Sequence, residues 1–519
     1  MSSIELSESI GSAVNSAARR RKRSILEFFP YPEIRPQQRE ILLEIEKAWD
    51  TYDVFVIVAP TALGKSAISL TIGKWAGNAS ILTPTNMLVR QFSDEFETEP
   101  GTFPTVGKLL RRSLYTCPRV AEGRLTCEDA VAQYGGTKKM KEKLGCSRDC
   151  EYIRDLGRAR GRGVGIYNYY TYLAHKLYRP VLIADEAHGL INVIQDLSSA
   201  KLWRHKYRYP PDMWNYSDVV RWVEGLESRD QLLDGLLDEV RSTTPRYVIK
   251  RDREMWNMCS PPEERELLKM LPIDVADAPP HFWPSRVRKI VLMSATISRK
   301  DIESLGLSKR RVLYLESDSP IPVERRPVIS VPVAKVNRGS MTSATEGIAA
   351  WIEENMLPRY QGCKGVIHAT YSQAKMFRER WSGNDRFIFH GKTDTAARYR
   401  DFLESPPESG RVLVASGMYE GLDLVDDLGR WQVIAKIPYP SLGDPAIEYK
   451  MRQDQEWYTW QALKLVMQGC GRISRRETDF GETYVLDSSF RSLYSSSLRM
   501  ELVPGWFRSA VQFREADEQ

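Results

Sequence analysis

Short apolar runs recur along the chain, and each is followed by a segment with helical spacing. The first run, Val54 to Val58, is apolar at every position and rich in β-branched residues, as is typical of an interior parallel strand. Five runs in the second half have the same character: Gly365 to Ala369, Arg386 to Phe389, Arg411 to Ala415, Trp431 to Ala435 and Thr483 to Leu486. Because strands alternate with helical patterns, we predict an α/β fold built on parallel, doubly wound sheets.

The turn after the first run has the spacing of a phosphate-binding loop, with Ala59 in place of the first glycine. In such a loop, backbone N–H groups and the N-terminus of the next helix cradle phosphates. Lys65 is then expected to reach the β- and γ-phosphates of ATP, and the Ser66 hydroxyl to coordinate Mg²⁺. Taken alone, the motif also fits an ordinary strand, turn and helix. The predicted nucleotide-binding residues of the loop are Ala59, Pro60, Thr61, Ala62, Leu63, Gly64, Lys65 and Ser66.

Another apolar run ends in two adjacent carboxylates, in the sequence Asp185-Glu186-Ala187-His188. Asp185, at the C-terminal end of a strand, is expected to hold Mg²⁺ directly or through water. Glu186 is expected to orient and deprotonate the attacking water. His188 is a candidate for coupling the nucleotide to a neighbouring motif, and its alternative is a plain surface histidine. The loop and the box, in this order, predict nucleotide hydrolysis.

Two arginines near the end of the chain complete the predicted catalytic set. Arg472 and Arg475 are three residues apart and would share one helix face if the segment is helical. Guanidinium forks suit the charge of a phosphoryl-transfer transition state. The catalytic candidates are therefore Lys65, Asp185, Glu186, Arg472 and Arg475.

Several further polar residues are candidates for contacting the nucleotide or for coupling. Gln38 lies just upstream of the loop, where its amide could read an adenine edge. We assign Asp423 and Gln468 to nucleotide binding, and Ser294, Thr296 and Glu420 to coupling together with His188.

This ordered set of motifs resembles that of superfamily-two helicases, and most closely the XPD/DinG group of iron–sulfur DNA helicases. The segments that carry the resemblance, from about residue 28 to about residue 490, are FFPYPEIRPQQ, VAPTALGKS, the NYYTYL run at Asn168, IADEAHGLINV, VLMSATIS, SGMYEGLDL and QGCGRISR. The resemblance implies two RecA-like motor domains with ATP between them, the loop and box in the first and the arginines in the second. It also implies an iron–sulfur insert and an arch insert in the first domain, and 5′-to-3′ movement on single-stranded DNA.

One position departs from the family pattern, because Ala62 stands where a glycine is usual. If the backbone there requires a positive φ, an alanine costs about 1–2 kcal/mol.

Four cysteines lie between the loop and the box with the spacing C-x9-C-x18-C-x3-C: Cys117, Cys127, Cys146 and Cys150. In a reducing compartment they favour metal or cluster ligation over disulfides. The spacing alone does not separate a cluster from zinc, since thiolates hold both. The resemblance favours a [4Fe–4S] cluster, with zinc as the minor alternative and free buried thiols as a further one.

Charge is concentrated around these cysteines. Residues 108–162 hold fourteen Lys or Arg and seven Asp or Glu, a net charge of +7, whereas the whole chain carries +6 (74 minus 68). Positive charge here could guide a nucleic-acid strand, or it could be a solvated surface. The expected organisation is a flexible basic arm (1–24), motor domain one (25–325) interrupted by the cysteine insert (108–162) and a small, mostly helical arch-like insert (198–285), and motor domain two (326–519).

We therefore predict an ATP-dependent DNA helicase that translocates on single-stranded DNA and unwinds duplex. The alternatives are a nucleic-acid-stimulated ATPase that remodels complexes without unwinding, and a non-catalytic nucleic-acid-binding module. Single-stranded and forked DNA are the expected partners, and RNA-containing hybrids are a further candidate. Neither a membrane-spanning run nor the apolar core of a signal peptide is evident. An intracellular location is expected, without a choice between cytoplasm or nucleoid and nucleus.

Overall fold

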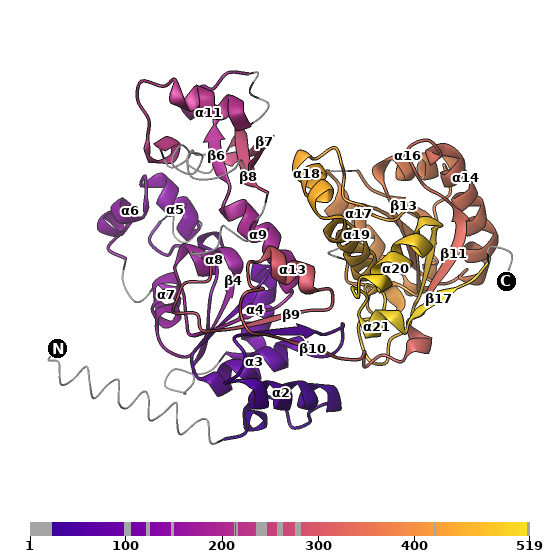
Figure 1. Cartoon of the computed structure of the whole chain (residues 1–519), viewed down its shortest axis with the longest axis horizontal. Helices are drawn as coiled ribbons and strands as arrows, with labels where there is room; N and C mark the ends of the chain where they lie inside the picture. Colours follow the sequence, from indigo (N-terminus) through magenta and orange to yellow (C-terminus); the bar gives the residue numbers. More distant parts are fainter. Residues whose placement is uncertain are drawn as a thin grey trace.

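The computed structural model describes residues 23–97, 105–120, 125–146, 150–211, 213, 216–234, 247–256, 263–273, 275, 282–391, 393–419 and 422–515. Two seven-stranded sheets form two domains that lie side by side (Figure 1). All strand pairs recorded within each of these sheets are parallel, which confirms the predicted α/β class.

The first domain is built on the sheet that carries the phosphate-binding loop. Its strand order is β10 (Val312–Glu316), β1 (Val54–Val58), β9 (Lys289–Ser294), β5 (Val181–Ala184), β2 (Ala79–Thr83), β4 (Val164–Asn168) and β3 (Val106–Leu109). Its helices include α2 (Pro36–Ala48), α3 (Lys65–Ala76), α4 (Asn86–Phe96), α8 (Tyr169–Ala174), α9 (Leu190–Leu197) and α13 (Arg299–Ser304). Strands β1, β2 and β4 are buried at every position, because both faces of the sheet are covered.

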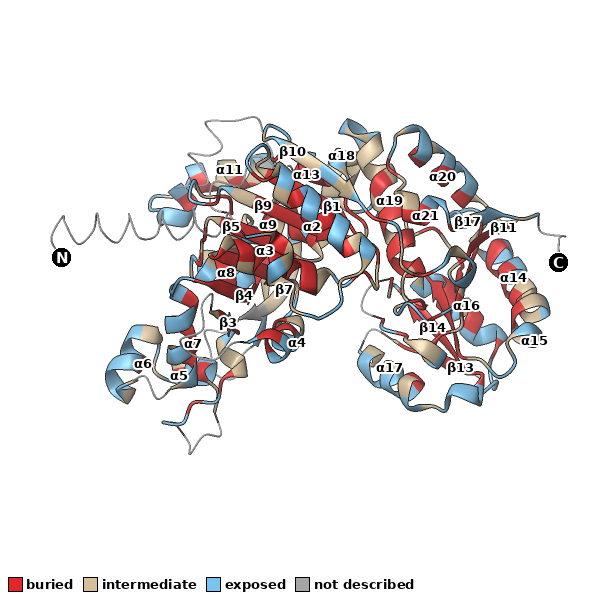
Figure 2. Cartoon of the chain, turned by 90° about the horizontal axis from the view of Figure 1, so that it is seen from below, coloured by how far each residue is buried: buried red, intermediate tan, exposed pale blue. Residues whose placement is uncertain are grey.

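The second domain contains all five strands predicted in the second half of the chain. Its strand order is β13 (Phe387–Phe389), β14 (Val412–Ser416), β12 (Gly365–Ala369), β15 (Trp431–Ile434), β16 (Glu482–Asp487), β11 (Val328–Ala334) and β17 (Val511–Phe513). The helices around it include α14 (Met341–Trp351), α16 (Tyr371–Arg380), α17 (Thr395–Glu404), α18 (Pro445–Gln453), α19 (Gln455–Cys470), α20 (Ser489–Arg499) and α21 (Gly505–Arg508). Buried residues follow the strands of both sheets, and exposed residues lie on the outer helices (Figure 2).

The cysteine insert leaves the first sheet after β3 and returns to it at β4. Its described helices are α5 (Cys127–Gln133), α6 (Thr137–Leu144) and α7 (Glu151–Arg160). A small separate core of Cys117, Val120, Ala130 and Met140 lies within it. Other residues of the insert, among them Tyr115, Cys127 and Tyr152, belong to the main core of the first domain.

The expectation of a mostly helical second insert is wrong for the residues that the structure describes. These residues are built around an antiparallel sheet in the order β6 (Ala200–Trp203), β8 (Glu263–Pro272) and β7 (Tyr247–Trp256), with the short helices α10 (Arg204–Tyr207) and α11 (Tyr216–Glu224) beside it. The ten-residue pairing of β7 with β8 overrides the helical propensity of the Glu- and Leu-rich β8 segment. Trp222 packs against the core of this insert, whereas Trp214 lies outside the described residues.

Two other predictions concern residues that the structure does not describe. Residues 1–22 of the expected basic arm and Glu420 are not among the described residues. Within the described part of the chain, the helices lack the combination of length and apolarity needed to cross a bilayer.

Candidate active site

The phosphate-binding loop follows the C-terminal end of β1, which lies between β10 and β9 in the first sheet, and leads into α3. Gly64, the residue that caps α3, has φ +80°, and Ala62 has φ +67°. Ala62 is thus a non-glycine residue in the left-handed region, the condition under which we expected strain. A Cβ at Gly64 would lie 2.5 Å from the Gln38 amide nitrogen, so this position requires glycine for space as well as for φ.

Gln38 is buried against the backbone of the loop. Its Nε2 donates to the Leu63 carbonyl at 2.8 Å, and its Oε1 accepts from the Arg35 N–H at 3.1 Å. The Arg35 guanidinium also donates to the Ala62 carbonyl. In this structure the Gln38 amide therefore supports the loop, while the assignment of adenine recognition to it stays a prediction.

A chain of polar contacts joins the loop to two other strand ends of the first domain. Lys65 Nζ lies 3.3 Å from Glu186 Oε1, and His188 Nδ1 lies 3.2 Å from Glu186 Oε2. The same His188 nitrogen lies 2.8 Å from Ser294 Oγ, at the end of β9. Because β1, β5 and β9 are neighbours in one parallel sheet, their C-terminal ends bring these four side chains together.

The two adjacent carboxyls of the box are in different electrostatic environments. Burial and the charge of Glu186 raise the pKa of Asp185 to about 6. Burial acts to raise the pKa of Glu186 as well, but Lys65 and His188 hold the Glu186 pKa below its usual range. Glu186 also has φ +51°, so its backbone is in the left-handed region. Such strain in a residue with a charged partner is common at functional sites.

The two arginines of the second domain are not on a helix face. Helix α19 ends at Cys470, and the Gly471 that follows is its C-cap, so Arg472 and Arg475 lie in the segment beyond it. Arg472 donates from Nε to the Tyr419 carbonyl and from Nη1 to the Leu422 carbonyl, each at 3.2 Å. Arg475 Nε lies 2.8 Å from Asp423 Oδ1. Of the two, Arg475 borders the loop.

A cavity of about 760 Å³ lies where the two domains meet. It is lined by Phe29, Tyr31, Glu33, Arg35, Gln38, Pro60, Thr61, Ala62, Leu63, Gly64, Lys65, Ser66, Ala67, Gln91, Glu95, Asp185, Glu186 and Arg475. The sequence analysis did not assign seven of these lining residues to the site: Phe29, Tyr31, Glu33, Arg35, Ala67, Gln91 and Glu95. The first four had a signal, since they lie in the FFPYPEIRPQQ motif together with Gln38.

Several buried polar atoms at the domain junction fit an additional ligand. Thr61 Oγ1 donates to the Ser474 carbonyl at 3.3 Å across the junction. Among the described residues, neither amide atom of Gln468 has a hydrogen-bond partner, and the same is true of Thr296 Oγ1 and Ser474 Oγ. Buried groups without partners are uncommon in folded proteins. Their presence here fits a site that binds a polar molecule such as a nucleotide.

The four cysteines approach one another within the insert. Cys117 N–H donates to the Leu125 carbonyl and Cys127 N–H to the Tyr115 carbonyl, both at 2.8 Å, which brings the first two cysteines together. Burial raises the pKa of Cys127 to about 11, and the Cys150, Cys117 and Cys146 thiols add to this rise.

These thiols do not form a completed metal site in the structure. Among the described residues, no group of three or more His, Cys, Asp or Glu side chains is arranged to hold a metal. Four thiols within electrostatic reach of one another suit iron–sulfur or zinc chemistry. Ligation by these four residues therefore stays a prediction.

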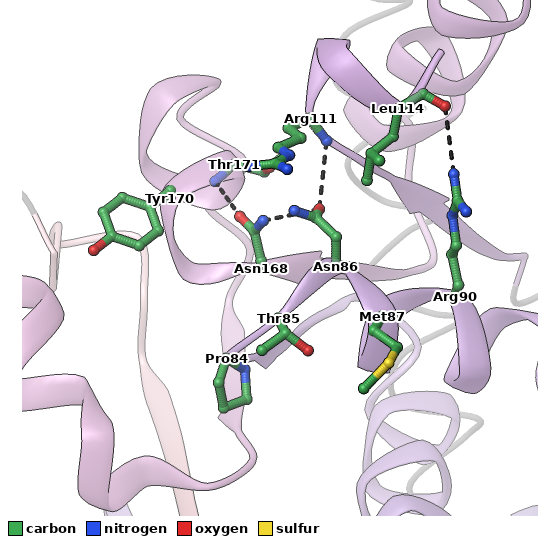
Figure 3. A pocket seen from close by; sticks show the side chains of 10 residues that line it. All are labelled: Pro84, Thr85, Asn86, Met87, Arg90, Arg111, Leu114, Asn168, Tyr170 and Thr171. Atoms are coloured by element: carbon green, nitrogen blue, oxygen red, sulfur yellow. Dashed lines mark hydrogen bonds between the residues drawn. The ribbon is translucent and has the colours of Figure 1, made fainter. Parts of the chain in front are cut away.

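A second cavity, of about 590 Å³, lies at the ends of β2 and β4 beside the cysteine insert (Figure 3). Asn168 Nδ2 donates to Asn86 Oδ1 at 2.9 Å, and the Thr171 N–H donates to Asn168 Oδ1 at 2.7 Å. Tyr170 is 45% exposed. The lining residues are Pro84, Thr85, Asn86, Met87, Arg90, Arg111, Leu114, Asn168, Tyr170 and Thr171. Amide, guanidinium and aromatic groups in one place suit the bases and phosphates of a single strand.

The fold defines a two-domain α/β protein of RecA-like architecture. Residues 355–508 match the sequence family described as "Helicase C-terminal domain". The chain is 24% identical over 279 residues to the "Regulator of telomere elongation helicase 1 homolog" of Caenorhabditis elegans, covering 44% of this chain and 27% of that protein. It is 36% identical over 145 residues to the Drosophila willistoni homologue, covering 25% of this chain and 14% of that protein. The chain thus spans less than a third of the length of these curated relatives.

The fold is also similar to that of solved structures. A structure titled "XPD_Helicase" matches 93% of this chain and 100% of its own, with a TM-score of 0.62 and 16% identity. A structure titled "Structure of S. tokodaii Xpd4" matches 92% of this chain and 100% of its own, with a TM-score of 0.55 and 15% identity. The matches thus confirm the resemblance to helicases, in sequence over residues 355–508 and in fold to the XPD structures.

Proposed function

We propose that this chain is an ATP-driven helicase that moves 5′ to 3′ along single-stranded DNA and unwinds duplex. The observation that carries the proposal is the cavity between the two domains. It brings Lys65, Asp185 and Glu186 of the first domain into one space with Arg475 of the second. A site divided between two domains couples hydrolysis to their relative movement, which is what a translocating motor needs.

Each group has a defined task in the proposed reaction. Lys65 binds the terminal phosphates, and Ser66 and Asp185 hold Mg²⁺, which neutralises charge on those phosphates. Glu186 orients the attacking water and accepts its proton. Arg475 turns from Asp423 towards the γ-phosphoryl group, where a guanidinium stabilises the charge of the transition state. His188 and Ser294 transmit a displacement of Glu186 to the C-terminal end of β9.

The proposed DNA path runs along the C-terminal edges of both sheets. In the first domain it passes the cavity of Asn86 and Tyr170, next to the insert with a net charge of +7. In the second domain the half-exposed Tyr371 and Tyr439 follow β12 and β15. Aromatic rings that stack on bases and cations that neutralise phosphates bind single strands with little dependence on sequence.

The active site is tested by two substitutions measured against one control. Lys65→Ala and Glu186→Gln should each abolish DNA-stimulated ATP hydrolysis, because they remove the phosphate-binding cation and the base. Lys47→Ala, a change at an exposed lysine of α2 paired with Glu44, should keep the wild-type rate. Near-wild-type turnover in either active-site variant would show that the site is assigned wrongly.

The reaction and its direction are tested with duplexes of defined ends. We expect ATP-dependent strand separation on 5′-tailed duplex and none on 3′-tailed or blunt duplex. Hydrolysis stimulated by single-stranded DNA without strand separation on any substrate would favour a translocase that remodels complexes. Replacing the tail by RNA distinguishes a DNA motor from an RNA motor.

We also propose that Cys117, Cys127, Cys146 and Cys150 hold a [4Fe–4S] cluster that stabilises the insert. Protein purified without oxygen should be brown and contain about four iron and four sulfide per chain. Cys127→Ser should lose the colour, and Cys363→Ser, a cysteine of the second domain, should keep it. Colourless protein with stoichiometric zinc would overturn the cluster.

A further inference from the structure

A buried ion pair joins the two domains away from the phosphate-binding loop. Asp301 belongs to α13 of the first domain, and Trp460 and Lys464 belong to α19 of the second. Asp301 Oδ1 lies 3.1 Å from Lys464 Nζ, and Asp301 Oδ2 accepts a 2.8 Å hydrogen bond from Trp460 Nε1. Asp301 and Trp460 are 0% exposed, and Lys464 is 7% exposed. The contact therefore places a charged pair in the interior of the domain junction.

Asp301 also fixes the start of its own helix. Its Oδ2 accepts from the Ser298 N–H at 2.9 Å, and Ser298 is the N-cap of α13. This cap lies two residues after Thr296, in the segment that continues from the end of β9. A displacement of Asp301 therefore shifts the segment that holds Ser294, the hydrogen-bond partner of His188.

The partners of Asp301 lie on the helix that leads to the second-domain residues of the nucleotide site. Lys464 precedes Gln468 by one turn of α19, and Trp460 precedes it by two turns. Arg472 and Arg475 follow the end of this helix. Because a helix is stiff over such a distance, holding Trp460 and Lys464 in place also sets the position and rotation of Gln468.

We propose that Asp301 is a positioning residue that fixes α19 to the first domain, so that the cavity opens and closes around this point. The proposal rests on the proposed function, since it concerns how the two domains are held for ATP hydrolysis. Arg475 and the contact of Thr61 with the Ser474 carbonyl reach the first-domain side of the cavity directly. A further line of contact runs through Asp301, Ser294 and His188 to Glu186.

The physical character of the contact suits a pivot. A buried ion pair tolerates little change in geometry, because either charge is strongly destabilised when its partner moves away. The neighbouring pair of Arg299 with Glu456 also crosses the domains, but both side chains are at least 40% exposed. Exposed pairs of this kind contribute little and can slide or exchange with water. Arg299 therefore offers a matched control for Asp301.

The test compares the variants Asp301→Asn, Asp301→Asn/Lys464→Met and Arg299→Gln with the wild-type chain. The measurements are the thermal unfolding midpoint, the KM for ATP, and kcat with and without single-stranded DNA. In Asp301→Asn the amide can still accept from Trp460, but the charge that balances Lys464 is gone. We expect at least a fivefold loss of DNA-stimulated kcat with KM changed less than twofold, and changes below twofold for Arg299→Gln.

The double variant separates positioning from stability. Replacing Lys464 by Met removes the uncompensated charge, so the unfolding midpoint should return towards wild type while stimulated kcat stays low. If the double variant regains both, or if Asp301→Asn keeps wild-type stimulation, Asp301 has only a structural role and the inference fails. Should Asp301→Asn not fold, the double variant carries the same test.

A readout that does not depend on activity distinguishes this inference from the proposed function. Backbone amides of α19 should exchange with solvent at least fivefold faster in Asp301→Asn than in Arg299→Gln. A wild-type chain without DNA-stimulated hydrolysis would refute the proposed function, while unchanged exchange in α19 would refute the pivot.

Discussion

The two sides of the nucleotide cavity differ in how their functional groups are held. On the first-domain side, Lys65, Glu186, His188 and Ser294 form a continuous series of contacts between 2.8 and 3.3 Å. On the second-domain side, Arg475 is paired with Asp423, and among the described residues the Gln468 amide has no hydrogen-bond partner. The groups on the first-domain side thus form one assembled network, whereas those on the second-domain side must re-aim to reach a nucleotide. This difference is what a motor with a moving half should have.

The largest effect is expected from removing Arg475, the second-domain group that must move. Arg475→Ala should lower DNA-stimulated kcat by about 10³-fold, in the range of other arginines that stabilise phosphoryl transfer. Nucleotide affinity, measured with a fluorescent analogue, should change only a few-fold, because the first-domain contacts remain. Arg476→Ala is the control, since this neighbouring arginine is exposed and paired with Asp426. An equal loss in both variants would contradict a specific role for Arg475.

A smaller effect is expected within the assembled side. Ser294→Ala removes the hydroxyl that contacts His188 and accepts from the Thr296 N–H at 3.1 Å. Loss of one such buried contact corresponds to about 1–1.5 kcal/mol, or roughly tenfold in DNA-stimulated kcat. Ser330→Ala, at a buried serine of β11 in the other domain, should leave the rate unchanged. If Ser294→Ala changes only the KM for ATP, the hydroxyl binds nucleotide and does not couple the strands.

The smallest effect concerns strain in the assembled side. Ala62→Gly should raise the free energy of unfolding by about 1 kcal/mol, because φ +67° is unfavourable for a residue with a Cβ. In a thermal melt this corresponds to a rise of about 2 °C. Ala67→Gly, inside α3, should shift the midpoint downwards, since glycine is unfavourable in a helix. Opposite changes in the unfolding midpoint at these two nearby positions would separate the effect of backbone conformation from that of removing the side chain.

The parts predictable from sequence are those that depend on local patterns. The strand runs were predictable because both faces of each sheet are buried, and the loop and box because parallel strand ends place their residues together. The end of α19 also had a local signal, the Gly471 that follows Cys470. The contact of Asp301 with Lys464 had none, because it depends on how two domains dock. The β7–β8 pairing was missed because strand preference is decided by the partner strand.

Both inserts are attached to the first sheet at neighbouring strands. Strand β5 pairs directly with β9, with Ala184 opposite Leu292, and β3 pairs with β4, with Leu109 opposite Tyr167. Because the paired strands are parallel, each insert leaves the C-terminal end of one strand and returns to the N-terminal end of its neighbour. Doubling the length of such a loop costs only about 0.6 kcal/mol of closure entropy. The stability of the sheet therefore depends little on the length of the inserted chain. These two connections can accommodate inserts of different size and fold.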